Sequence, residues 1–272
     1  MVQARPIGGI LEHRHAVCFD VSMHIRAVSL DVGWTLAYPR ESMWEIFADV
    51  CRGAGVAVSA EETESMVRSL WLVGQRRAEE HLRSGGQYSD SDEEFAAQFR
   101  FLGQLIFGQL GVRGDTETLM EEFFRRFWQP DQWQVFPDAL DTIRTLRALG
   151  LRVGVLSNAP SDMPRLLDRL GILPYLDYVV ISAREGTRKP DRRIFQRAIE
   201  LAGASADQVV HVGDMYVEDV LGGRHAGVHT FLIERGKHAL FPNHAESEGR
   251  NLADLRVVRS LAEFVDRVRD LL

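Results

Sequence analysis

The sequence predicts an α/β protein built on a doubly wound parallel sheet, with an all-helical unit inserted near its N-terminal end. Short apolar runs at 27–30, 153–156 and 209–213 are bounded by turn residues and are typical of buried parallel strands. Helical patterns separate the later runs, which indicates right-handed βαβ crossovers. Residues 39–134 instead show helical periodicity throughout. A chain of 272 residues, 45% of them hydrophobic, can bury such a core and also carry an insert.

The elements of the core follow one another in a regular order. The first strand, 27–30, ends at Asp31. After the insert, a helix is expected from Pro137 to Leu149, stopped by Gly150 and followed by the strand that ends at Ser157. The later elements alternate in the same way: helix 164–170, strand 178–182, helix 191–202, strand 209–212, helix 218–226, strand 228–232, and a last helix capped by Ser260 with Glu263.

The predicted organisation is a core of residues 23–38 and 135–272, with 39–134 as a helical cap. Residues 236–251 lack periodicity and are expected to form a loop. Residues 1–22 read as an extension before the fold, either a disordered arm or a product of start-site choice.

The insert is expected to hold about four helices. Two helix starts have capping-box spacing, Ser59 with Glu62 and Ser91 with Glu94. Apolar residues then recur at steps of three and four, as on one face of a helix. The members of this pattern are Trp44, Phe47, Ala48 and Cys51, then Phe95, Phe99, Leu102 and Ile106, then Leu119, Phe123, Phe124 and Phe127.

Polar residues stand at the ends of the predicted strands. Asp31, Ser157 and Asp214 each directly follow an apolar run, and ligands of open α/β sheets bind beyond the carboxyl ends of the strands. Lys189 is also notable, because the chain has only two lysines among its 32 basic residues. A chain that otherwise uses arginine is expected to keep lysine where a compact ammonium is needed.

Four motifs together resemble the haloacid dehalogenase superfamily. They are Asp31-Val32-Gly33-Trp34-Thr35-Leu36, Leu156-Ser157-Asn158, Arg188-Lys189-Pro190-Asp191, and Gly213-Asp214 with Asp219. The resemblance covers 27–36 and roughly 135 to the C-terminus. It implies a Rossmann-like core, and it matches the insert to the helical cap of one branch of the superfamily.

The resemblance also implies a catalytic nucleophile and a metal. Asp31 would attack phosphorus and form an aspartyl-phosphate. Mg²⁺ would be held by Asp31, the backbone carbonyl of Gly33 and Asp214, with Asp219 in support.

A phosphate-binding set follows from the same motifs. Ser157 and Asn158 would donate hydrogen bonds to the phosphoryl group, and Lys189 would neutralise charge on Asp31 and the phosphate. Arg188 and Arg192 are expected to be solvated.

The chain departs from the family pattern at Gly33. Phosphatases of the superfamily carry a second aspartate there, which serves as general acid and then as general base. Its absence should favour low-pKa leaving groups, such as aryl or acyl phosphates, or require a proton carrier from the cap. Glu79, Glu80 and His81 are the cap residues considered for that role, although a solvated face explains His81 more simply. Glu218, beside Asp219, is expected to face outward.

Three functions remain open at this point. A Mg²⁺-dependent phosphatase acting on a small phosphorylated metabolite fits all four motifs. A 2-haloacid dehalogenase would also lack the second aspartate, but the resemblance implies that such enzymes work without metal and lack the Asp214 and Asp219 pair. A weak or inactive protein that binds a phosphorylated ligand or a protein is the third. The resemblance implies that phosphonate hydrolases of the superfamily need a cap lysine to form a Schiff base with their substrate. No lysine lies between Pro39 and Trp133, so this branch is excluded.

Composition and charge argue against a nucleic-acid or membrane partner and indicate the redox compartment. The net charge is −7 with no block of like charge, so no nucleic-acid partner is expected. No apolar stretch approaches the roughly 20 residues of a membrane span. Cys18 and Cys51 lack CxxC spacing and suit a reducing cytoplasm.

The sequence indicates neither the substrate nor the oligomeric state. Specificity should come from the cap. Its aromatic residues are expected to serve mainly in packing, namely Trp44, Trp71, Phe95 and Trp128.

Overall fold

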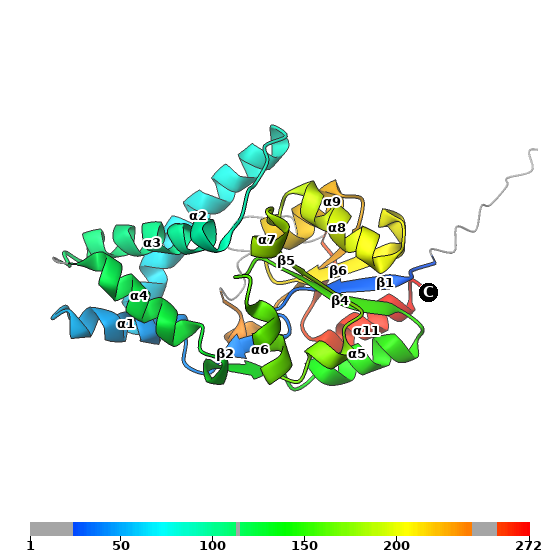
Figure 1. Ribbon diagram of the computed structural model, residues 1–272, viewed down its shortest axis with the longest axis horizontal. Coiled ribbons are helices and arrows are strands. Elements are labelled where there is room, and N and C mark those ends of the chain that lie inside the picture. The colour runs from blue at the N-terminus through cyan, green and yellow to red at the C-terminus, as the bar shows by residue number, and fades with distance from the viewer. Residues whose placement is uncertain (1–23, 113–114, 241–254) are drawn as a thin grey trace, which may run out of the picture.

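The computed structural model describes residues 24–112, 115–240 and 255–272 (Figure 1). The predicted extension 1–22 and residues 241–251 of the predicted loop lie outside the described residues.

A six-stranded parallel sheet forms the centre of the molecule, in the order β5-β4-β1-β6-β7-β8. Its strands are β1 (Ala27–Leu30), β4 (Arg152–Ser157), β5 (Tyr178–Ile181), β6 (Val209–Gly213), β7 (His229–Ile233) and β8 (Val257–Val258). The chain runs outward from β1 in both directions, as a doubly wound sheet requires. The predicted fold class is therefore confirmed.

The strand register brings the polar strand ends to one edge of the sheet. Leu30 of β1 is level with Val155 of β4 and with Val212 of β6. Asp31 follows Leu30 directly, whereas Ser157 and Asp214 each lie two residues beyond their aligned valines. Because the strands are parallel, all three residues emerge at the same carboxyl edge.

Helices cover both faces of the sheet (Figure 1). On one face lie α5 (Ala139–Ala148) and α11 (Leu261–Arg269), and on the other α8 (Arg192–Ala202) and α9 (Gly222–His225). A hydrophobic cluster lies on each face of the sheet, because successive side chains of a strand point to opposite faces. In β1, Val28 packs in the cluster that includes α5 and α11, and Ala27 packs in the cluster that includes α8. Two shorter helices, α6 (Met163–Arg169) and α7 (Ser182–Glu185), follow β4 and β5.

Among the described residues, four helices lie between the first strand and the rest of the core, in agreement with the expected number. They are α1 (Met43–Gly53), α2 (Ala60–Arg83), α3 (Asp92–Gln109) and α4 (Thr116–Phe127), which extend to one side of the sheet in Figure 1. The capping box of Ser59 and Glu62 is present. At Ser91 only half of the predicted box forms, because the Glu94 carboxylate instead accepts a 2.6 Å hydrogen bond from the Ser89 hydroxyl. The boundaries 39 and 134 remain a prediction.

Three features differ from the expected elements. A two-stranded antiparallel ribbon of β2 (Ala37–Pro39) and β3 (Trp133–Val135) joins the core to the helical region, and strands of three residues are too short to show alternation. The helix expected at 218–226 begins earlier, as a π-helical turn, η4 (Tyr216–Leu221), that leads into α9. Strand β8, of two residues, was also not predicted. Single 3₁₀ turns complete the described chain: η1 (Pro130–Gln132), η2 (Leu173–Tyr175), η3 (Ala206–Gln208) and η5 (Gly236–His238).

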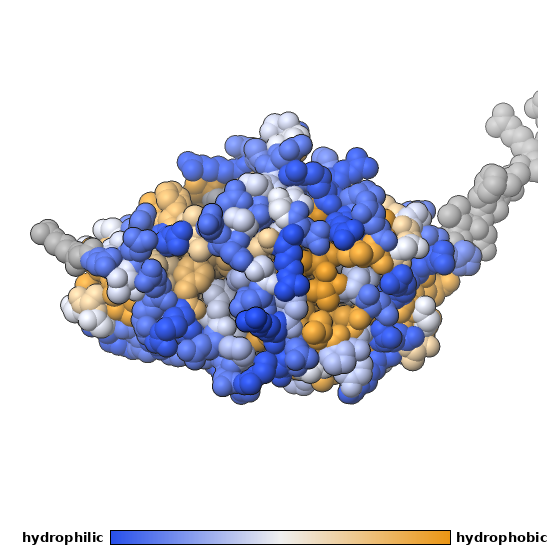
Figure 2. All heavy atoms as spheres, viewed as in Figure 1, coloured by the Kyte–Doolittle hydropathy of each residue, from blue (hydrophilic) through white to orange (hydrophobic). Residues whose placement is uncertain are grey.

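The surface drawn in Figure 2 is largely hydrophilic, with hydrophobic atoms visible between the blue side chains. None of the helices in the described part of the chain combines the length and the apolar character that crossing a bilayer requires.

Candidate active site

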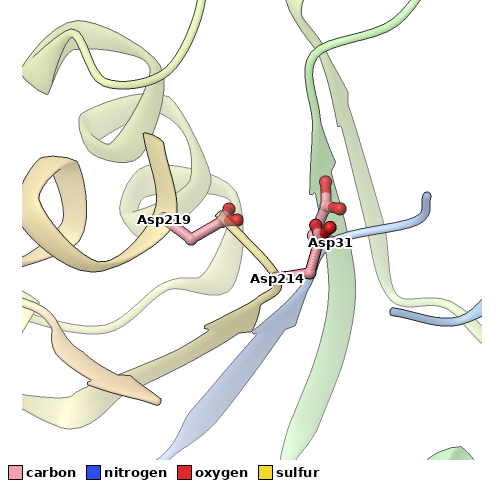
Figure 3. A group of neighbouring side chains, drawn as sticks. All are labelled: Asp31, Asp214 and Asp219. Carbon is pink, nitrogen blue, oxygen red and sulfur yellow. The ribbon is translucent and has the colours of Figure 1, made fainter. Parts of the chain in front are cut away.

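Three aspartates meet at the carboxyl edge of the sheet. Asp31 directly follows β1, Asp214 directly follows β6, and Asp219 lies in the π turn η4. One carboxylate oxygen from each lies within 4.8 Å of the other two. Figure 3 shows the Asp219 side chain pointing from its turn towards the other two carboxylates. All three are buried, with exposed fractions of 6%, 5% and 0%.

Lys189 connects two of these carboxylates. Its Nζ donates to Oδ1 of Asp31 at 2.7 Å and to Oδ1 of Asp219 at 2.5 Å, and its side chain is almost completely buried. Asn158 fixes the main chain of Lys189, because its Oδ1 accepts from the Lys189 N–H at 2.8 Å and its Nδ2 donates to the Lys189 carbonyl at 3.0 Å. Asn158 was predicted to donate to phosphate, and in this geometry only one hydrogen of its side-chain amide is left for that purpose.

His211 is a residue of the site that was not predicted. It lies fully buried in β6, and its Nε2 is 2.9 Å from Oδ1 of Asp219, where the carboxylate accepts the hydrogen bond. Oδ2 of Asp219 accepts from the Met215 N–H at 2.9 Å. Asp219 is therefore held by three donors of this chain, which suits a supporting role. The signal was available in the sequence, because a histidine inside a buried strand needs a hydrogen-bonding partner.

Burial sets the titration behaviour of the cluster. Burial, with Asp31 and Asp219 close by, raises the pKa of Asp214 well above its usual range. Burial also raises the pKa of Asp31, although Lys189 opposes it. Burial would also raise the pKa of Asp219, but the neighbouring Lys189 and His211 outweigh it and hold that pKa below its usual range. Burial disfavours the Lys189 ammonium, yet Asp219 and Asp31 together raise its pKa.

The loop after Asp31 is held in an unusual backbone conformation. Trp34 has a φ of 51°, in the left-handed region that costs a residue with a side chain roughly 1–2 kcal/mol. Its N–H donates to the Ala37 carbonyl at 2.7 Å, which closes the turn. The buried guanidinium of Arg235 donates to the Thr35 carbonyl at 2.6 Å and pairs with both oxygens of Asp138. These contacts position the loop that carries Asp31.

A cavity of about 320 Å³ opens onto this cluster. All the predicted site residues except Asp219 line one end of it, namely Asp31, Gly33, Ser157, Asn158, Lys189 and Asp214. Asp219 does not line the cavity, and its carboxylate contacts Lys189. The remainder of the wall is mostly apolar and comes largely from the helical region.

Two charged residues do not lie as expected. Glu218 lines the cavity, and its Oε1 accepts a hydrogen bond at 3.1 Å from Nε2 of Gln75 on α2. The prediction assumed a regular α-helix over these residues, whereas Glu218 lies in the π turn η4. Burial raises the pKa of Glu218. Arg188, expected to be solvated, also lines the cavity and lies 5.0 Å from the centre of the Tyr88 ring.

The cap residues considered as proton carriers do not line this cavity. Glu79 forms an ion pair with Arg83. His81 is exposed, and its Nε2 lies 3.1 Å from the Gln87 carbonyl.

Comparison with known proteins agrees with the motifs. Residues 45–227 match the model of the haloacid dehalogenase-like hydrolases. The chain is 34% identical over 224 residues to haloacid dehalogenase-like hydrolase domain-containing protein 3 of Homo sapiens, covering 81% of this chain and 86% of that protein. It is 32% identical over 131 residues to the glyceraldehyde 3-phosphate phosphatase of Methanothermobacter thermautotrophicus, covering 48% of this chain and 58% of the phosphatase.

The fold is also similar to that of a solved enzyme. The L-2-haloacid dehalogenase of Xanthobacter autotrophicus, with chloropropionic acid covalently bound, superposes with a TM-score of 0.64 at 18% identity. The match covers 91% of this chain and all of that one. At this identity the likeness shows the fold alone.

Proposed function

Because this chain belongs to the haloacid dehalogenase-like hydrolases, we propose that it is a Mg²⁺-dependent phosphatase that acts on a small phosphorylated metabolite through Asp31. Its similarity to glyceraldehyde 3-phosphate phosphatases supports phosphoester rather than carbon–halogen chemistry. The free buried thiol of Cys51 suits the reducing cytoplasm, where we place the protein.

The balance of charge at the sheet edge carries the proposal. Three buried carboxylates lie within 4.8 Å of one another, and Lys189 and His211 are the basic side chains that the described residues place in hydrogen-bond contact with them. Burial and the crowding of these carboxylates raise the pKa of Asp214 well above its usual range, and a divalent cation would stabilise the three carboxylates in their ionised form. Carboxylate oxygens are the ligands that Mg²⁺ prefers in proteins. Asp31 and Asp214, with the carbonyl of Gly33, would hold the ion, and Asp219 would support it through Lys189.

In the first half of the reaction, the Asp31 carboxylate attacks phosphorus. The Asp31 O–P bond forms as the bond from phosphorus to the leaving oxygen breaks. Lys189 neutralises charge on Asp31 and on the phosphoryl oxygens, and Ser157 donates to the phosphoryl group. A bound Mg²⁺ would supply further charge stabilisation for the phosphoryl oxygens. Gly33 has no proton to give, so the leaving oxygen departs as an anion or takes its proton from water.

In the second half, water attacks phosphorus and the Asp31 O–P bond breaks. Inorganic phosphate leaves and the carboxylate is regenerated. The attacking water must lose a proton, and at Gly33 no side chain is present to accept it. We therefore propose that this step is slow and that the phosphorylated Asp31 accumulates during turnover.

Dehalogenation is the second candidate, and two observations favour it. Gly33 offers no carboxylate, and the cavity beyond Asp31 is mostly apolar, as a haloalkyl group would prefer. In that reaction Asp31 would displace halide from carbon, and water would then hydrolyse the resulting ester.

One experiment separates these functions. The protein is assayed with phenyl phosphate, with and without Mg²⁺, for phosphate release and with 2-chloropropionate for chloride release. The proposal predicts phosphate release that depends on Mg²⁺ and disappears in Asp31→Asn. Chloride release without metal would assign the dehalogenase, and no turnover of either compound would assign a non-catalytic role.

A further inference from the structure

All five tryptophans of the chain line the cavity that opens onto Asp31. Although they are spread over a hundred residues of sequence, the fold brings them to one cavity. They are Trp34, Trp44, Trp71, Trp128 and Trp133. Aromatic side chains of the cap were expected to serve mainly in packing; Trp44 and Trp71 do lie in or against the hydrophobic core, and they also line this cavity.

Contacts between aromatic rings hold the tryptophan wall, the name used below for these five residues, in place. Trp128 and Trp133 stack with ring centres 5.5 Å apart and planes at 15°. Phe95 meets Trp128 edge-on at 5.8 Å, and Phe127 stacks against Trp34 at 6.4 Å. Preorganised aromatic faces bind a flat apolar group at low entropic cost.

The cavity offers little to a polyhydroxylated substrate. Beyond the catalytic cluster, its charged or amide-bearing lining residues are Gln98, Arg188 and Glu218. Gln98 is exposed, and Arg188 lies over the Tyr88 ring. The buried Oε2 of Glu218 and the indole Nε1 of Trp128 have no hydrogen-bond partner among the described residues, so each could pair with one hydroxyl group. The further hydroxyl groups of a sugar would be buried against aromatic rings without partners, at a cost for each unpaired group.

On the basis of the tryptophan wall, we propose that the substrate is an aromatic phosphomonoester. This inference rests on the proposed phosphatase activity. Its phosphate would lie at Asp31 and its ring system against the tryptophan wall. A cavity of about 320 Å³ is adequate for one or two fused rings. An aryl leaving group also suits Gly33, because a phenolate needs no proton to depart.

The first test compares two esters whose leaving groups are phenols of similar acidity, 2-naphthyl phosphate and phenyl phosphate. The second ring adds apolar area without changing the chemistry. We expect kcat/KM to be at least about tenfold higher for the naphthyl ester. Phe99 lines the cavity, so Phe99→Ala should reduce this preference. Phe101, on the same helix, is 63% exposed, and Phe101→Ala is the matched control, which should retain the preference for the naphthyl ester.

The second test measures binding without turnover. Intrinsic fluorescence reports on this cavity directly, because every tryptophan lines it. Naphthylmethylphosphonate should quench or shift the emission, whereas methylphosphonate at equal concentration should change it little.

The outcomes separate this inference from the proposed function. Equal kcat/KM for the two esters, or a fluorescence change no larger for the naphthyl compound, would overturn the aromatic substrate class and leave a phosphatase. Hydrolysis of neither ester would overturn the phosphatase, while a strong response to naphthylmethylphosphonate would still support an aromatic ligand. The fluorescence titration uses the wild-type chain, so it remains decisive if Phe99→Ala fails to fold.

Discussion

Restoring an acid at position 33 is a sharp perturbation of this site. A Cβ added at Gly33 finds no atom within 4 Å, and the backbone there does not adopt a left-handed conformation. The first atom of a side chain at position 33 therefore needs no backbone shift, and position 33 lines the cavity in which the leaving group would lie. The new carboxylate can act as general acid and then as general base.

The size of the effect depends on the leaving group. A positioned general acid or base accelerates a reaction by about 10² to 10⁴, which is roughly 3–5 kcal/mol of barrier. We expect a gain of this size for benzyl phosphate, because an alkoxide departs poorly without a proton. The gain should be much smaller for 4-nitrophenyl phosphate in the first step, because that phenolate leaves unaided.

The assay measures kcat/KM for both esters at saturating Mg²⁺. Gly33→Asn is the matched control, because it has the same shape but cannot transfer a proton, and circular dichroism checks that each variant folds. A fourth acidic side chain also adds repulsion, so Gly33→Asp should melt at a lower temperature than wild type when Mg²⁺ is absent. If Gly33→Asp folds and gains nothing on benzyl phosphate, or if Gly33→Asn gains as much, the assignment of the missing proton carrier is refuted.

Three further predictions follow from the same geometry. Lys189→Met removes the ammonium and leaves buried carboxylates unpaired, so it should abolish turnover and lower the free energy of unfolding by about 3–5 kcal/mol, as measured by chemical denaturation. Lys237→Met, at an exposed lysine, should change neither the turnover nor the free energy of unfolding. Mg²⁺ should raise the melting temperature of the wild type but scarcely that of Asp214→Asn, and equal shifts would place the ion elsewhere. Burial raises the pKa of the Cys51 thiol to about 11, so in the folded protein the thiol stays protonated below that pH. In the unfolded chain the thiol ionises at a lower pH, so the free energy of unfolding should fall as the pH rises from the unfolded pKa towards 11. At mildly alkaline pH, peptide mapping should find Cys51 alkylated by iodoacetamide only in unfolded protein, and rapid native labelling would contradict its burial.

The sheet and its polar edge could be predicted because they depend on local pattern. Asp31, Ser157 and Asp214 each end a short apolar run, and parallel pairing then places them at one edge whatever the rest of the chain does. Lys189 stood out by composition alone. The geometry of its contacts with Asp31 and Asp219 could not be predicted, because it depends on a loop 158 residues from Asp31 in the sequence.

The cavity depends on how the helical region packs against the core, and no local pattern encodes that packing. Helical periodicity marked Trp44 as apolar, but it could not distinguish a residue that fills a core from one that faces a cavity. Glu218 was predicted to face outward on the assumption of a regular α-helix, whereas a π turn carries it. The hydrogen bond between Gln75 and Glu218 joins residues 143 apart and becomes visible only in the assembled fold.

Rapid mixing with 4-nitrophenyl phosphate and Mg²⁺ tests the central claim most directly. Because Asp31 can take the phosphoryl group but no side chain at Gly33 helps water remove it, we predict a burst of nitrophenolate approaching one equivalent per active site, followed by slow turnover. Mass spectrometry of acid-quenched protein should find one phosphoryl group on the peptide that contains Asp31, and none in Asp31→Asn or without Mg²⁺. Steady turnover with no burst and no label, or a label on another residue, would contradict the account.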